Sequence, residues 1–143
     1  MRSMIAQRHS RSWAMVALTA GLVVALVRPL AAVPPLSLLG TFSGSYVQSG
    51  SGTPHTLQIE IEKQHRRRLR VSVFAMNQPE YQGPGKLSKD NGTVTAKTRA
   101  TGKGAPRFLV TATVSDSGHT LAGGYTIRSK GRADVTGTFS VAR

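Results

Sequence analysis

The chain has 143 residues, 39% of them hydrophobic and 6% aromatic, and its 19 Lys and Arg against 6 Asp and Glu give a formal net charge of +13. This length predicts one domain, and 15 Gly and 7 Pro suit a small β protein rich in turns. Because the chain has no Cys, disulfides, a thiol nucleophile, Cys-ligated zinc and a lipid-modified cysteine are excluded.

The first 32 residues are typical of a secretory signal peptide. Residues 1–12 are basic and polar, residues 13–27 are apolar without a charge, and Leu30-Ala31-Ala32 offers small residues for cleavage. The apolar stretch is short for a membrane span, which needs about 20 residues. We therefore expect cleavage after Ala32 and an exported protein, periplasmic or extracellular. The alternative is an uncleaved membrane anchor, because Arg28 lies close to the cleavage site.

After a linker at residues 33–39, residues 40–143 are predicted to form a single all-β domain. Its segments alternate apolar and polar residues, as strands with one buried face do, and no helical period follows residue 35. We expect eight strands at residues 41–48, 56–62, 69–75, 81–88, 93–98, 107–114, 119–127 and 135–141. The fourth carries the weakest signal, because Pro84 lacks a backbone donor and favours an edge strand or a bulge.

The even spacing and short loops favour a small antiparallel up-and-down barrel, with a β-sandwich as the alternative. Gly44, Gly123 and Gly137 fall on the inward face of their strands, where glycine relieves crowding in a sharply coiled barrel. Closure would pair the first strand with the last, and both carry Gly-Thr-Phe, at residues 40–42 and 137–139.

Three short segments resemble the layout of the calycin-type barrels, which are the lipocalins and avidins. They are GTFSGSY at residues 40–46, LAGGY at 121–125 and VTGTFSV at 135–141. The resemblance implies an eight-stranded barrel that binds a small ligand in its mouth. Trp13, the single Trp, lies in the signal segment, and Phe42 stands where lipocalins carry the Trp of Gly-x-Trp. We take the architecture from the resemblance and no ligand residue.

Alternation places Phe42, Tyr46, Tyr125 and Phe139 on the inward face. They would line a pocket for a small apolar ligand, or else form an ordinary core. No catalytic residue, metal ligand or cofactor is predicted. A barrel-type cyclase or isomerase remains a further hypothesis, but it needs a buried polar group that the sequence does not identify.

The strongest charge signal lies between the second and third expected strands, in a hairpin tip made of Lys63, His65, Arg66, Arg67, Arg68 and Arg70. Arginine forks suit phosphate, sulfate and carboxylate oxygens, so the tip is a candidate for binding an anionic surface such as a glycan or phospholipid. The alternative is a solvated tip whose charges only prevent strand pairing. Nucleic acid is not expected, since no exposed aromatic set accompanies the arginines. Without the four basic residues of the signal segment, 15 basic and 6 acidic residues leave a net charge of +9.

Overall fold

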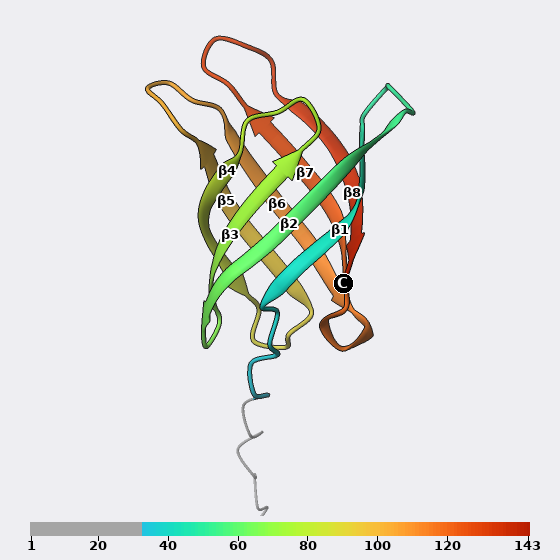
Figure 1. Cartoon of the computed structure of the whole chain (residues 1–143), viewed down its shortest axis with the longest axis vertical. Coiled ribbons are helices and arrows are strands. Elements are labelled where there is room, and N and C mark those ends of the chain that lie inside the picture. The colour runs from blue at the N-terminus through green and yellow to red at the C-terminus, as the bar shows by residue number, and fades with distance from the viewer. Residues whose placement is uncertain (1–32) are drawn as a thin grey trace, which may run out of the picture. The chain divides into compact units, whose positions relative to one another are not determined.

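A computed structural model of the chain describes residues 33–143, and the expected signal peptide lies outside the described residues. Export, cleavage and anchoring therefore stay predictions. The described part forms a self-contained unit of eight antiparallel strands (Figure 1). They are β1 (Gly40–Gln48), β2 (Pro54–His65), β3 (Arg68–Ala75), β4 (Tyr81–Leu87), β5 (Thr93–Ala100), β6 (Arg107–Ser115), β7 (Thr120–Arg128) and β8 (Val135–Ala142). A short 3₁₀ turn, η1 (Asp116–Gly118), joins β6 to β7.

Each strand pairs with the next along the chain, and β1 also pairs with β8, so the sheet closes into a barrel. In the closing pair Tyr46 lies opposite Phe139 and Gly44 opposite Val141. The predicted barrel is confirmed, and the sandwich alternative is wrong. Four loops lie at one end of the barrel, which we call the upper end (Figure 1); they are residues 49–53, 76–80, 101–106 and 129–134. The turns at 66–67, 88–92 and 116–119 share the lower end.

The inward glycines are confirmed as positions of close strand approach. A Cβ added to Gly123 would lie 2.1 Å from the Thr111 carbonyl oxygen and 2.8 Å from the Ala112 Cα atom of β6. Gly44 and Gly137 stand equally close to neighbouring backbone. Any side chain at these positions would push two strands apart, and therefore glycine permits the tight coiling that closes eight strands.

The expectation for β4 is wrong in one respect, because this strand lies inside the wall between β3 and β5. Pro84 faces Arg70 of β3, and the register toward β5 is the same on both sides of the proline. The bulge lies instead in β2, where the register shifts between Ile61 and Lys63. One extra residue reverses the alternation beyond that point, and it turns Gln64 toward the interior opposite buried Leu69.

The turn between β4 and β5 has the chemistry expected of Asn-Gly. Asn91 has a φ of 61°, in the left-handed region that Asn tolerates. The Asp90 carboxylate accepts hydrogen bonds from the Ser88 hydroxyl and, at 3.0 Å, from the Gly92 amide. The two hydrogen bonds lower the pKa of Asp90 below its usual range, and the bond from Ser88 has the larger effect.

Candidate functional site

Aromatic rings occupy the upper half of the barrel interior. The Phe108 ring stacks on Tyr125 at 5.2 Å between centroids and lies 5.1 Å from Tyr81. Tyr46 meets Tyr125 edge to face at 5.6 Å. All four side chains are buried, and their rings line the upper half of the interior, where a calycin-type barrel would hold its ligand.

The hydroxyls of the three tyrosines differ in their partners. Tyr46 donates to the Met76 carbonyl oxygen and Tyr81 to Gln78 Oε1, both at 3.1 Å, which ties them to the loop between β3 and β4. The Tyr125 hydroxyl is buried without a hydrogen-bond partner in the described chain. Burial raises the pKa of each of these tyrosines above 10, so their hydroxyls stay protonated at neutral pH.

The four residues predicted to line a pocket do not form one group. Tyr46, Tyr125 and Phe139 meet in the upper half, through the Tyr46–Tyr125 contact and the pairing of Tyr46 with Phe139. Phe42 lies four residues back along β1, about 13 Å away at the usual rise of a strand. The Arg143 guanidinium lies over its ring, 5.2 Å from the centroid. Phe42 therefore belongs to the core of the lower end.

Two members of the aromatic group, Tyr81 and Phe108, are absent from the predicted set. Both lie next to a loop, at the first and second positions of β4 and β6 respectively. Alternation marks Phe108 as inward, but only the closed register shows that it contacts Tyr81 and stacks on Tyr125.

The basic hairpin tip projects at the lower end, but its members have unequal roles. The β2–β3 turn consists of Arg66 and Arg67, closed by the pair His65–Arg68. Arg66 is exposed and has a φ of 55°, a conformation that is uncommon for a residue with a long side chain. Most of the predicted tip is therefore strand, with only two residues in the turn.

Arg67 is a structural residue. Its guanidinium donates to the carbonyl oxygens of Ser88 and Val33 and, at 2.9 Å, to Asn91 Oδ1. Asn91 in turn donates to the Pro34 carbonyl oxygen at 2.8 Å. These contacts fix the segment at residues 33–39 against the lower end of the barrel.

Gln64, turned inward by the bulge, holds the same segment from the other side. It accepts a hydrogen bond from the Leu38 amide and donates one to the Leu36 carbonyl oxygen, both at 2.7 Å. Leu38 is completely buried, and Leu36 packs against the core. Residues 33–39, expected to be a linker, therefore cover the lower end of the barrel.

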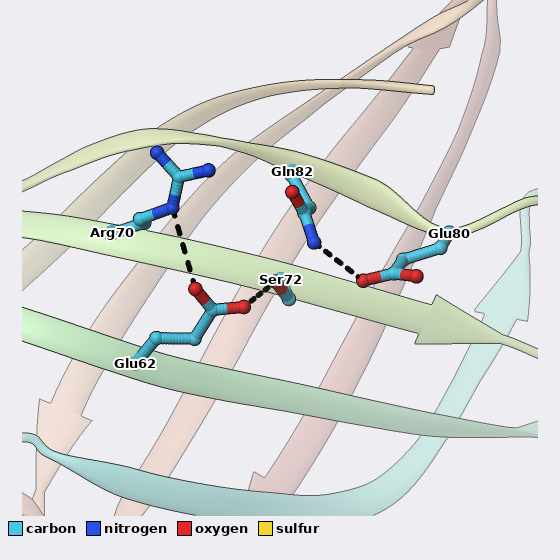
Figure 2. Close-up of polar contacts among 5 residues, drawn as sticks. All are labelled: Glu62, Arg70, Ser72, Glu80 and Gln82. Atoms are coloured by element: carbon cyan, nitrogen blue, oxygen red, sulfur yellow. Dashed lines mark hydrogen bonds and ion pairs between the residues drawn. The ribbon is translucent and has the colours of Figure 1, made fainter. Parts of the chain in front are cut away.

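Arg70 has a local partner on the outer wall of β2 and β3. Its Nε atom lies 3.4 Å from Glu62 Oε2, and buried Ser72 donates to the other oxygen of the same carboxylate at 2.5 Å (Figure 2). On the adjacent strand Gln82 donates to Glu80 at 2.7 Å. Glu62 thus joins Ser72 and Arg70 and partly neutralises the Arg70 guanidinium, whose side chain stays 55% exposed.

Lys63, His65, Arg66 and Arg68 surround hollows on the lower end. A groove of about 570 Å³ lies between the segment at residues 33–35 and the hairpin tip. Its lining on the side of the tip consists of His65, Arg66, Arg67, Arg68 and Lys86. Leu39 lines a second hollow with Lys63 and Arg68. Val33 and Leu39 are 50% and 47% exposed, so apolar groups are displayed directly beside the cations.

Within residues 33–143 the acidic groups neutralise few of these charges. The two ion pairs there are Arg70–Glu62 and Arg128–Asp134. No three His, Asp or Glu side chains of the described residues gather as metal ligands would. In the same part of the chain no helix has the length and apolar character of a membrane span.

Comparison with known proteins bears on the fold. A solved structure described as EF1p2_mFAP2b bound to DFHBI is similar, with a TM-score of 0.55 over 74% of this chain and 93% of that chain. The two sequences are 12% identical, and the likeness therefore concerns the fold alone. No protein-family model matches the chain, and no curated protein matches it. The closed eight-stranded antiparallel barrel fits a calycin-like fold, as the sequence resemblance implied.

Proposed function

We propose that this protein is a binding barrel without catalytic activity, which attaches to an anionic membrane surface through its lower end. The observation that carries the proposal is the combination of unpaired cations, namely Lys63, Arg66 and Arg68, with the exposed side chains of Val33 and Leu39. Interfacial binding needs both parts, because apolar groups enter the headgroup region while cations meet anionic lipid.

The expected strength of this attachment is moderate. Each Lys or Arg close to an anionic membrane contributes about 1 kcal/mol, so the three cations supply about 3 kcal/mol. Stable attachment requires two signals of this kind. The apolar segment at residues 13–27, if it were retained, would be the second signal.

The test is sedimentation with lipid vesicles, using the chain from residue 31 onward so that the apolar segment does not contribute. Vesicles of neutral lipid are compared with vesicles that contain 30% anionic phospholipid. A tip variant, Lys63→Gln/Arg66→Gln/Arg68→Gln, leaves the structural Arg67 in place. It should bind anionic vesicles about 100-fold more weakly, the equivalent of three lost cations.

The matched control removes the same number of charges at the upper end, as Arg99→Gln/Arg107→Gln/Arg128→Gln. It should stay within about threefold of the unmodified protein, since those residues lie far from the proposed contact. Equal losses in the two triple variants would show that only net charge matters and would refute the proposal. Equal binding to neutral and anionic vesicles would refute it as well.

A second candidate function is the binding of a small apolar ligand in the upper half of the barrel. It is favoured by the Tyr125 hydroxyl, because a buried hydroxyl without a partner costs about 1–3 kcal/mol that a bound polar atom would recover. The similar solved barrel is described with a small molecule bound. The same hydroxyl would also serve a barrel-type cyclase or isomerase as its buried polar group.

Native mass spectrometry of the purified protein tests this candidate. A retained small molecule that is lost in Tyr125→Phe would support it. A bare protein mass, together with unchanged unfolding when apolar compounds are added, would leave the aromatic rings as plain core.

A further inference from the structure

A second cationic surface lies at the upper end, opposite the hairpin tip. Arg99 on β5 is the register partner of Arg107 on β6, and Arg107 is the partner of Arg128 on β7. All three side chains are exposed. Neighbouring strands are about 4.8 Å apart, so three guanidinium groups form a row about 10 Å long across the wall. We call these three residues the arginine row.

The row conflicts with the usual rules of strand pairing. Like charges placed directly opposite each other destabilise a sheet, and here two such pairs share the central Arg107. Asp134, 3.1 Å from the Nε atom of Arg128, is the acid that pairs with the row in the described chain. Arg99 and Arg107 therefore repel each other without compensation from an internal partner.

The surface beside the row is hollowed. A hollow of about 410 Å³ lies between the β5–β6 and β7–β8 loops, and all three arginines line it together with Lys130. A second, of about 300 Å³, lies lower on the wall and shares Arg99 and Arg107 with the first while adding Lys97. The two loops stand next to each other at the upper end (Figure 1). The hollows make a track along the wall, which suits an extended chain with several charges better than a single small anion.

We propose that this track binds a linear polyanionic glycan, whose sulfate, phosphate or carboxylate groups are spaced along the arginine row. Arginine forks recognise all three oxyanions. The exposed large hydrophobic residues of the described chain are Val33, Leu39, Phe74 and Met76. None of these four lines either hollow, and the apolar residues that do, Ala105 and Leu109, are half-buried, so the track offers little apolar surface to a membrane. It also presents no aromatic ring on which a nucleic-acid base would stack.

The experiment measures binding of a heparin decasaccharide by calorimetry at several salt concentrations, with the chain from residue 31 onward. The row variant Arg99→Gln/Arg107→Gln/Arg128→Gln should bind at least tenfold more weakly. The slope of log affinity against log salt should fall by about three, one for each cation removed. The tip variant Lys63→Gln/Arg66→Gln/Arg68→Gln has the same net charge and should stay within threefold.

The row variant should also be at least as resistant to heat as the unmodified protein, because its cross-strand repulsion is gone. Weaker binding by a better-folded variant excludes misfolding as the cause. Equal weakening in both triple variants, or tighter binding of single-stranded DNA than of heparin, would overturn the proposal. Polygalacturonate, a carboxylate polymer, then identifies the group that the arginine row recognises. If it binds as tightly as heparin, the recognised group is carboxylate. If it binds much more weakly, the recognised group is sulfate or phosphate.

This inference is independent of the membrane proposal, since the two surfaces lie at opposite ends of the barrel and have separate variants. Both proposals would be established if the tip variant loses vesicle binding but keeps heparin binding, and the row variant loses heparin binding but keeps vesicle binding.

Discussion

Replacing Gly123 with alanine is the most direct test of why the barrel closes as it does. The new Cβ atom would lie 2.1 Å from the Thr111 carbonyl oxygen, whereas ordinary contacts begin near 3.4 Å. To relieve this overlap, β6 and β7 must separate by more than 1 Å at this point, which also lengthens ladder hydrogen bonds. Overpacking costs about 1–3 kcal/mol and each lost hydrogen bond about 1 kcal/mol, so we expect a loss near 3 kcal/mol.

The neighbouring glycine supplies the control. A Cβ added to Gly124 points outward and meets only the Gly137 carbonyl oxygen at 3.6 Å, an ordinary contact. Gly124→Ala should therefore be neutral, or stabilising by about 0.5 kcal/mol because the unfolded chain loses freedom. Urea unfolding followed by far-ultraviolet circular dichroism measures both variants. At this chain length Gly123→Ala should melt about 12 °C lower. If the two variants unfold within about 0.5 kcal/mol of each other, the close-approach explanation is wrong.

Three further predictions concern single side chains. Arg67→Ala should release residues 33–39, which would be seen as faster amide hydrogen exchange there, while the β8 amides exchange as before. Tyr125→Phe should leave stability unchanged or raise it by about 1 kcal/mol, because it removes an unpaired hydroxyl, whereas Tyr46→Phe should cost about 1 kcal/mol in thermal unfolding. The lowered pKa of Asp90 favours the folded state above the unfolded-state pKa, and this contribution disappears as the pH falls through the folded value. Asp90→Asn should thus flatten the fall in melting temperature below about pH 4, the usual pKa of an Asp, and an unchanged profile would contradict the assignment.

The strands could be predicted because each keeps one face in the core. Leu57, Ile59 and Ile61 are buried as the alternation indicated. The bulge in β2 was hidden because Glu62 and Lys63 are both polar, so the sequence shows no break in pattern where the phase reverses. Pro84 favours an edge strand or a bulge because it lacks a backbone donor, but a closed barrel has no edges and the register of β4 does not shift at the proline.

The functional surfaces were harder to predict, because the neighbours of an arginine in the folded chain decide whether it is free to bind an anion, and these neighbours are not visible in the sequence. Arg66 and Arg67 are adjacent in the sequence, yet the first is free and the second holds a segment more than 30 residues away. The arginine row depends on the register across β5, β6 and β7, and these residues show no cluster along the chain. Consecutive arginines at residues 66–68 are visible in the sequence, whereas the arginine row exists only through the pairing of three strands.

The attachment of residues 33–39 has a consequence for the order of folding. Arg143 donates to the Ser37 carbonyl oxygen at 3.0 Å, across 106 positions of sequence, and the β1–β8 ladder lies beside this contact. Local hairpins can form early, but the closing ladder must wait until β8 is available. A chain that emerges from a ribosome or a translocation channel with residue 33 ahead of β8 would until then expose the free edge of β1, a site for pairing with other chains. Brief contact with a chaperone at that stage is therefore expected to raise the yield of folded protein.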